Sequence, residues 1–180
     1  MTIHQLNLTV KHNHDIYQID YVKMEKMLEI RRYQETDNQV VWELHHLALG
    51  PTGAFLRDDK WDEDLHDIQN RYLNNGGEFL LGVLENNIVC MGAFRKKTAT
   101  LAEIKRMRVL PGYQRRGFGQ IILHKLEEKA LQLGYKEMCL DTTTRQIAAQ
   151  KLYEKNGFIE VRRGKLAEFE LIFYHKYISK

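Results

Sequence analysis

The sequence is poor in cysteine, and the two cysteines it has favour a reducing compartment. Cys90 and Cys139 each lie inside an apolar run of the 180-residue chain. Small oxidised domains depend on several cysteines, whereas isolated cysteines in apolar runs are typical of buried, reduced thiols. We therefore expect two reduced thiols and a cytoplasmic location, although a single bridge between the two stays open.

Long apolar runs and a large net charge are also missing. No run approaches the roughly 20 residues that a bilayer span needs, and the N-terminal region lacks the basic start, apolar block and cleavage site of a signal peptide. The 27 basic and 24 acidic side chains leave a net charge of +3. So small a charge does not by itself predict binding to nucleic acid or to a membrane surface. These absences predict a soluble, unprocessed protein.

What the chain does contain is enough apolar sequence for one domain. Hydrophobic residues make up 43% of the chain and charged residues 28%, and a chain of about 100 to 200 residues usually forms a single domain. We expect that domain over residues 26–180. Residues 1–25, where a strand-like stretch is followed by polar "KHNHD", are expected to form a peripheral N-terminal extension.

Hydrophobic periodicity and turn residues predict a mixed order of strands and helices. Strands are expected over residues 27–33, 79–84, 88–94, 100–109, 136–142, 158–161 and 169–174, and helices over 38–49, 61–73, 118–133 and 147–155. Asp37 is expected to cap the first helix, and the turn Glu85-Asn86-Asn87 to close a hairpin. This order predicts an α/β fold with a mixed sheet and helices on both faces.

The stretch Val109–Leu126, "VLPGYQRRGFGQIILHKL", has the features of an anion-binding loop. A helix that begins near Gly117 presents unpaired backbone N–H groups and a partial positive charge, and Gly119 lets an anion approach the backbone closely. Arg115 and Arg116 add positive charge there. The expected ligand is a pyrophosphate, although the motif alone also fits a glycine-rich turn with two solvated arginines.

The surrounding sequence resembles the GNAT superfamily of acetyl-coenzyme A dependent N-acetyltransferases. The resemblance is carried by "AEIKRMRVLPGYQRRGFGQIILHKLEEKALQLGY", then "LDT" and "AAQKLYEKNGF", and it is strong from about residue 100 to 161. Gln114, Gly117 and Gly119 match the core signature of the superfamily. The resemblance implies a mostly antiparallel central sheet of about six to seven strands with helices on both faces.

The resemblance also implies acetyl-CoA as the cosubstrate. The cofactor-binding residues that it implies are Met107, Arg108, Val109, Gln114, Arg115, Arg116, Gly117, Phe118, Gly119, Gln120, Gln146 and Tyr153. Backbone groups of Met107 and Val109 would pair with the pantetheine arm like an added strand, and the Val109 amide would polarise the thioester carbonyl. Many members have Asn where this chain has Gln146, which puts that contact in doubt.

Two residues are candidates for catalysis on the same resemblance. Tyr153 stands where many members place the acid that protonates the departing thiolate, and its alternative is packing with Leu152 against the sheet. Glu103 matches a glutamate that serves as base, often through water, in one branch of the superfamily. Strand alternation predicts that Glu103 and Met107 share a face. Alternatively, Glu103 pairs only with Lys105 or an arginine.

The acceptor is expected to be a primary amine of a small molecule or a peptide, which attacks acetyl-CoA directly in a ternary complex. The acidic stretch "RDDKWDEDLHD", with Asp58, Asp59, Asp62, Glu63, Asp64 and Asp67, could attract a cationic amine, although a solvated helix start explains it as well. The eight histidines have no zinc spacing, so no metal is expected, and His124 is predicted to lie on the surface. A homodimer stays open.

Two other functions remain as alternatives. The fold could be a non-catalytic acetyl-CoA-binding sensor module, although Glu103 and Tyr153 are both present. Alternatively, "KRMR" and "QRR" could form a nucleic-acid surface. Strand alternation divides the cations of "KRMR" between two faces, which disfavours that second alternative.

Overall fold

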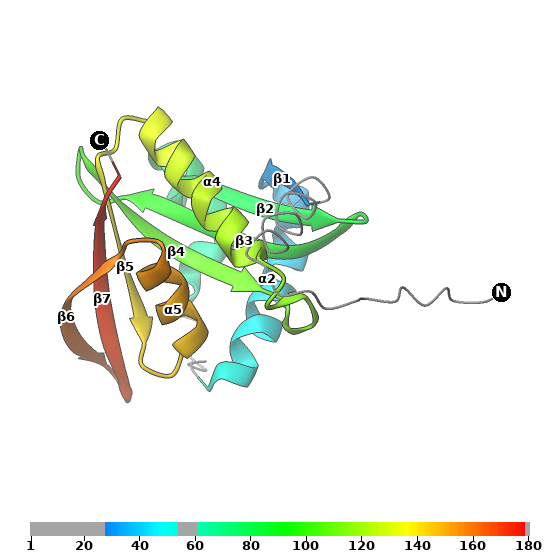
Figure 1. Ribbon diagram of the computed structural model, residues 1–180. Coiled ribbons are helices and arrows are strands. Elements are labelled where there is room, and N and C mark those ends of the chain that lie inside the picture. Colours follow the sequence, from blue (N-terminus) through cyan, green and yellow to red (C-terminus); the bar gives the residue numbers. More distant parts are fainter. Residues whose placement is uncertain (1–27, 54–60, 179–180) are drawn as a thin grey trace, which may run out of the picture.

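The computed structural model describes residues 28–53 and 61–178, and these residues form one seven-stranded sheet (Figure 1). The strand order is β1-β2-β3-β4-β5-β7-β6. The strands are β1 (Glu29–Arg32), β2 (Glu78–Leu84), β3 (Asn87–Lys96), β4 (Leu101–Val109), β5 (Glu137–Thr143), β6 (Ile159–Leu166) and β7 (Phe169–Tyr177). Neighbours are antiparallel except for β4 and β5, so the mixed, mostly antiparallel sheet is confirmed. The extension expected over residues 1–25 lies outside the described residues.

Helices cover both faces of the sheet, as predicted (Figure 1). The α-helices are α2 (Asn38–Leu49), α3 (Ile68–Arg71), α4 (Phe118–Gln132) and α5 (Ile147–Lys155). The 3₁₀ turns are η1 (Glu35–Asp37), η2 (Gly50–Thr52), η4 (Glu63–His66), η5 (Leu73–Asn75) and η6 (Pro111–Tyr113). One core lies beneath α4 and α5, and a second lies between the opposite face of the sheet and α2 with α3.

Helix α2 has the predicted bounds, but its predicted cap is wrong. The Asp37 carboxylate accepts hydrogen bonds from Arg31 at 2.7 and 2.8 Å and from the backbone N–H of Gln34 at 2.8 Å. The Asp37 side chain therefore forms an ion pair with Arg31 on β1 and does not cap the first turn of α2.

The helix predicted over residues 61–73 is also wrong, because two short helical segments replace it. Asp67 has φ −143°, which interrupts the helix, and its side chain then caps α3 by accepting from the backbone N–H of Asn70. Leu65, Ile68 and Tyr72 are all buried. Their spacing of three and four residues is that of one helical face, and the two separate turns satisfy it equally well.

A β-bulge in β4 reverses the alternation of its side chains. Arg106 has φ +57°, and Arg106 and Met107 together oppose the single residue Gly92 on β3. Ile104 before the bulge and Met107 after it both face the core beneath α4. Glu103 and Met107 consequently lie on opposite faces, so the expectation that they share one is wrong.

The parallel pairing of β4 with β5 is short and leaves part of β4 open. Only Leu101–Glu103 pairs with Glu137–Cys139. In the described part of the chain, the rest of β4 therefore has no strand partner on the edge that faces β5. Unpaired backbone N–H and C=O groups on such an edge are ready to accept an added strand.

Candidate active site

A cleft of about 200 Å³ lies where β4 and β5 separate. Residues 104–108 of β4 form one wall, and Asp141, Thr142 and Thr143 of β5 form another. Tyr153 of α5 also lines the cleft. The cleft therefore joins the open edge of β4 to the face of the sheet that carries α2.

The loop that leaves β4 presents the first turn of α4 without a side-chain cap. Arg115 and Gly117 both have left-handed backbone conformations, with φ of +61° and +83°. No side chain among the described residues caps α4, whose first turn begins with the 3.1 Å bond from the Ile121 N–H to the Gly117 carbonyl. The Gln114 side chain donates to the Val109 carbonyl at 3.1 Å and ties the loop to β4. This arrangement leaves backbone donors and the helix dipole available to an anion.

Gly119 leaves room at this helix start. A Cβ built there would lie 3.5 Å from Leu152 and 3.7 Å from Val109, which are ordinary contacts. The packing of the protein itself therefore does not require glycine at this position. Arg116 lies over the Tyr113 ring, 5.2 Å from its centroid, so this cation stays beside the loop.

Two polar side chains of α4, one from its first turn and one from its second, bind Asn156 at the C-terminal end of α5. Gln120 and His124 both contact the Asn156 side chain, His124 through its Nε2 at 3.0 Å from Asn156 Oδ1. His124 is half-buried, so its prediction as a surface residue is wrong. The contribution that Gln120 could make to anion binding is accordingly limited to its backbone N–H.

Tyr153 is buried and lines the cleft with its ring packed among aromatics. Its side chain contacts the rings of Phe158 and Tyr174, with centroids 5.8 and 6.2 Å away. Burial raises the pKa of its phenol above the ordinary value, and nearby Arg108 only partly opposes this effect. The hydroxyl is therefore protonated at neutral pH.

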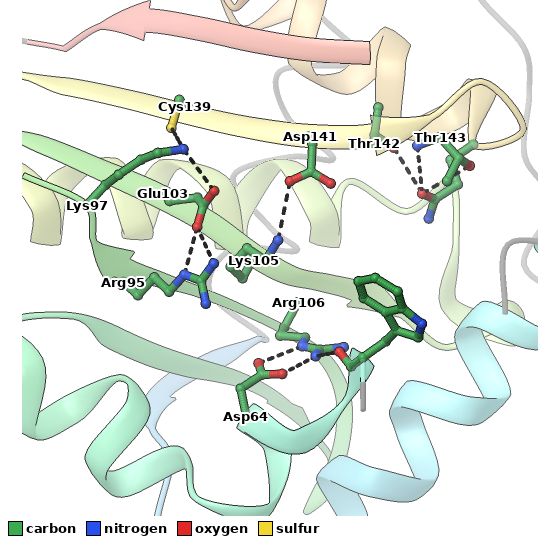
Figure 2. Close-up of polar contacts among 12 residues, drawn as sticks. Asp64, Arg95, Lys97, Glu103, Lys105, Arg106, Cys139, Asp141, Thr142 and Thr143 are labelled. Atoms are coloured by element: carbon green, nitrogen blue, oxygen red, sulfur yellow. Dashed lines mark hydrogen bonds and ion pairs between the residues drawn. The ribbon is translucent and has the colours of Figure 1, made fainter. Parts of the chain in front are cut away.

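Glu103 is held by two cations beside the cleft (Figure 2). Arg95 Nε donates to its carboxylate at 2.7 Å and Lys97 Nζ at 3.1 Å. Burial would raise the pKa of Glu103, but the charge of Lys105 and the bonds from Arg95 and Lys97 outweigh it and lower the pKa. The ion pair with an arginine, which the sequence left open as the alternative to a role as base, is present, and Glu103 is not among the residues that line the cleft.

Gln146 lines the cleft at the start of α5. Its Oε1 accepts from Thr142 Oγ1 at 3.0 Å and from the Thr143 backbone N–H at 3.3 Å. These bonds fix its side chain against the end of β5 and leave the two amide N–H groups for other partners.

Two carboxylates of the acidic stretch, Asp62 and Asp64, are held by a cation of the protein itself, whereas Glu63 and Asp67 are exposed. Asp62 accepts from Arg106 Nη1 at 2.6 Å, and Asp64 accepts from the Tyr72 hydroxyl. Figure 2 shows Asp64 bound by the same Arg106 guanidinium. Burial opposes ionisation of Asp62, but His45 and Arg106 lower its pKa to about 2. The carboxylates of Asp62 and Asp64 thus neutralise Arg106. Asp58 and Asp59 lie outside the described residues.

The bulge also gathers cations that alternation was expected to separate. Lys105, Arg106 and Arg108 all line the cleft, so the predicted division of "KRMR" between two faces is wrong. Lys105 pairs with Asp141 at 3.3 Å (Figure 2). Arg106 is bound by Asp62 and Asp64, which leaves Arg108 as the remaining cation of the three.

Arg108 has no acidic partner among residues 28–53 and 61–178. Its Nη1 donates to the Met107 carbonyl at 2.9 Å, and its buried Nε has no hydrogen-bond partner. Burial and the charge of Arg106 lower the pKa of Arg108 to about 10, so the side chain remains charged at neutral pH. The sequence predicted Arg108 only as a coenzyme contact. It did not predict that the side chain lies in the cleft, because strand alternation alone does not reveal a bulge.

The sequence matches the model of the acetyltransferase (GNAT) family over residues 29–158. The chain belongs to the GNAT family. The match includes β4, the loop before α4 and α5, which together surround the cleft.

Curated GNAT relatives share about a third of the aligned residues. N-acetylaspartate synthetase of Xenopus tropicalis is 35% identical over 100 residues, covering 54% of this chain and 37% of the relative. Human N-acetyltransferase 8 is 31% identical over 127 residues, which cover 62% of this chain and 56% of the relative. An alanine N-acetyltransferase of ribosomal protein bS18 from Haemophilus influenzae is 34% identical over 90 residues, covering 49% and 61%. The chain therefore matches only part of each relative's length.

Solved GNAT structures have the same fold. An acetyltransferase from Staphylococcus aureus superposes with a TM-score of 0.78 at 25% identity, over 84% of this chain and 99% of that one. An acetyltransferase from Salmonella typhimurium, solved with its cofactor acetyl-CoA, superposes with a TM-score of 0.69 at 17% identity, over 86% of this chain and 95% of that one. The GNAT fold that the resemblance implied is thus confirmed.

The GNAT cleft is lined by four of the predicted site residues. Met107, Arg108, Gln146 and Tyr153 line it, and the loop of residues 114–120 begins at the end of its β4 wall. Within the described ranges, no group of three or more His, Cys, Asp and Glu side chains could hold a metal ion. None of the helices described is long and apolar enough to cross a membrane. Cys90 and Cys139 are both free, and Cys139 is only half-buried.

Proposed function

We propose that this chain is an N-acetyltransferase that moves an acetyl group from acetyl-CoA to a primary amine by direct attack in a ternary complex. One observation carries the proposal: the unpaired edge of β4 lies next to the uncapped start of α4. The edge suits an amide-containing arm such as pantetheine, and the helix start suits a pyrophosphate. These two chemical groups are adjacent parts of coenzyme A.

The residues present fit this coenzyme in size as well as in polarity. The packing around Gly119 has room for a Cβ atom, and glycine leaves this space empty. The space suits a phosphate group close to the backbone. Arg115 and Arg116 supply positive charge, and the N–H groups of Phe118, Gly119 and Gln120 belong to the first turn. Backbone groups of Met107 and Val109 would pair with the pantetheine arm, and the Val109 N–H would polarise the thioester carbonyl.

Tyr153 is the proposed acid. In the transfer, the amine nitrogen forms a bond to the acetyl carbon and the carbon–sulfur bond breaks. The departing thiolate takes a proton from the Tyr153 hydroxyl, which is protonated at neutral pH and lines the cleft. The amine loses its own proton to a base or to water.

Glu103 is the proposed base, acting through water. Its lowered pKa keeps the carboxylate ionised at neutral pH, and the bonds from Arg95 and Lys97 fix its orientation. The same bonds weaken it as a base, since a carboxylate with a lowered pKa holds a proton poorly. A water molecule is needed because Glu103 does not line the cleft.

For the acceptor, the cellular location and the partners, we propose only broad classes. One relative is named for N-acetylaspartate and another for an alanine of a ribosomal protein, so both small-molecule and peptide amines belong in the proposal. Two free thiols support a cytoplasmic location. We propose no metal, nucleic-acid or membrane partner, and a homodimer remains to be tested by the mass of the protein in solution.

Binding of acetyl-CoA is tested by thermal unfolding. A ligand at 100 times its Kd adds about 2.7 kcal/mol, which is roughly 5 to 11 °C in melting temperature for a chain of this size. Gly119→Leu should fold and lose this shift, because the added side chain occupies the space at the helix start. The matched control is Gly50→Leu, at an exposed glycine where a Cβ meets nothing within 4 Å. A full shift in Gly119→Leu would contradict the assignment of the loop.

Turnover is tested by the thiol that acetyl-CoA releases in the presence of amines. The screen should include amino acids, polyamines, aminoglycosides and peptides. Release with at least one class supports the transferase. A normal thermal shift with no release from any class would favour the non-catalytic sensor instead.

A further inference from the structure

Arg108 is the charged group of the cleft that the proposed acetyl transfer leaves without a role. Arg106 is neutralised by Asp62 and Asp64, and Lys105 is paired with Asp141. Among the described residues, the Arg108 side chain has only the Met107 carbonyl as a hydrogen-bond partner. Burying a cation that forms no ion pair is costly, and a bound anion would offset this cost.

The side chain of Arg108 lies on the face of the sheet that carries α2. Met107 and Val109 pack against the core beneath α4, so alternation directs the residue between them to the opposite face. There burial lowers the pKa of His45 on α2, Asp62 opposes this effect, and the charge of Arg108 lowers the pKa further. The guanidinium is thus close to α2 and separated by the strand from the core under α4.

The position of Arg108 also relates it to the reaction centre. Its charge acts on the Tyr153 phenol, and both residues line the cleft. Its backbone lies between the two residues whose main chain would hold the pantetheine arm. A group bound by the Arg108 side chain would therefore lie within one small molecule's length of the thioester, on the side from which an amine can approach.

We propose that the acceptor is an amine that also carries a carboxylate, such as an amino acid, and that Arg108 binds this carboxylate. A guanidinium presents two parallel N–H donors that match the two oxygens of a carboxylate. The cleft volume of about 200 Å³ suits a small acceptor. The proposal rests on the acetyltransferase function and names the acceptor class for the same site.

Matched acceptors test this selectivity directly. Alanine, aspartate and glutamate are compared with carboxamides in which every carboxylate is replaced by an amide. The amine is kept and all negative charge is removed. We expect the wild type to prefer the carboxylate by about 10- to 100-fold in kcat/KM, the range of a hydrogen bond to a charged group. Arg108→Met should reduce this ratio to about 1, mainly through the KM of the acceptor, and Arg108→Lys should retain part of it.

Controls separate this role from others that Arg108 could have. Arg163→Met removes an exposed arginine that pairs with Glu160 on β6, outside the cleft, and should keep the wild-type ratio. The thermal shift with acetyl-CoA reports whether each variant still folds and binds the coenzyme. An equal loss of kcat for carboxylates and carboxamides would overturn the proposal, because Arg108 would then act on the thioester. A preference for phosphorylated amines over carboxylates would overturn it as well.

Binding without turnover distinguishes failure of this inference from failure of the proposed function. The thermal shift caused by each amino acid is measured in the presence of coenzyme A. A shift that Arg108→Met abolishes would support the carboxylate site even if no thiol is released from acetyl-CoA. If neither amino acids nor their carboxamides shift the wild type and none is acetylated, the proposal is refuted.

Discussion

Arg106→Met should destabilise the fold strongly, because it leaves buried carboxylates without a cation. The Arg106 side chain is only 8% exposed, and those of Asp62 and Asp64 are 10% and 16% exposed. Arg106 also donates to the Trp61 carbonyl at 2.7 Å. The guanidinium therefore fixes the segment before α3 against β4, and methionine keeps much of its volume but none of these bonds.

The expected loss follows from the cost of breaking a buried ion pair. Removing one partner of such a pair costs about 3 to 5 kcal/mol. For a chain of this size, that is roughly 6 to 20 °C in melting temperature. Arg163→Met is the matched control, since its side chain is 62% exposed and an exposed ion pair contributes about 0 to 1 kcal/mol.

The pH dependence supplies a second and more specific readout. In the wild type, the pKa of Asp62 is about 2, below its ordinary value of 3.8. Against the effect of burial, His45 and Arg106 together lower this pKa, so the ionised carboxylate stabilises the fold above about pH 4, and the contribution is lost as the pH falls toward 2. Without Arg106, burial should raise the pKa values of Asp62 and Asp64. Acidification should then protonate these carboxylates in the variant and remove the free-energy cost of burying their unpaired charges.

Urea unfolding at several pH values measures both effects. The difference between wild type and Arg106→Met should be largest at pH 7 and should narrow as the pH is lowered toward 4. A loss below about 1 kcal/mol, the range of exposed pairs, would refute the reasoning, as would a difference that does not change with pH.

The catalytic assignments give two further predictions. Tyr153→Phe should lower kcat by roughly 10² to 10⁴ while the KM for acetyl-CoA and the melting temperature scarcely change, since only the hydroxyl is lost; a kcat within about twofold of wild type, outside that range, would leave Tyr153 with a packing role. Glu103→Gln should reduce the rate most at low pH, where the free amine is scarce, and the loss should shrink as the pH rises. An unchanged profile in steady-state kinetics would leave Glu103 with only its ion pairs to Arg95 and Lys97.

Local patterns in the sequence were sufficient for most elements and for the loop. The bounds of α2 and α5 match the predictions, because apolar spacing and nearby turn residues define both helices. The hairpin turn has Glu85 and Asn86 with positive φ, as the short polar turn indicated. The loop before α4 was predictable because glycine at 117 serves a backbone requirement, φ +83°, that few other residues meet.

The charged side chains of the cleft were decided only by tertiary structure. Asp62 and Asp64 lie more than 40 residues from Arg106 in sequence, so nothing local predicts their ion pairs or the interrupted helix around them. The bulge at Arg106 arises from pairing with β3, and it places Arg106 and Arg108 beside Lys105 in the cleft. Hydrophobic period and turn chemistry act over a few residues, whereas ion pairs and strand register depend on which distant segments meet. The sequence by itself therefore determined most of the elements and the glycine-containing loop before α4, and the packing of the sheet decided which charges line the cleft.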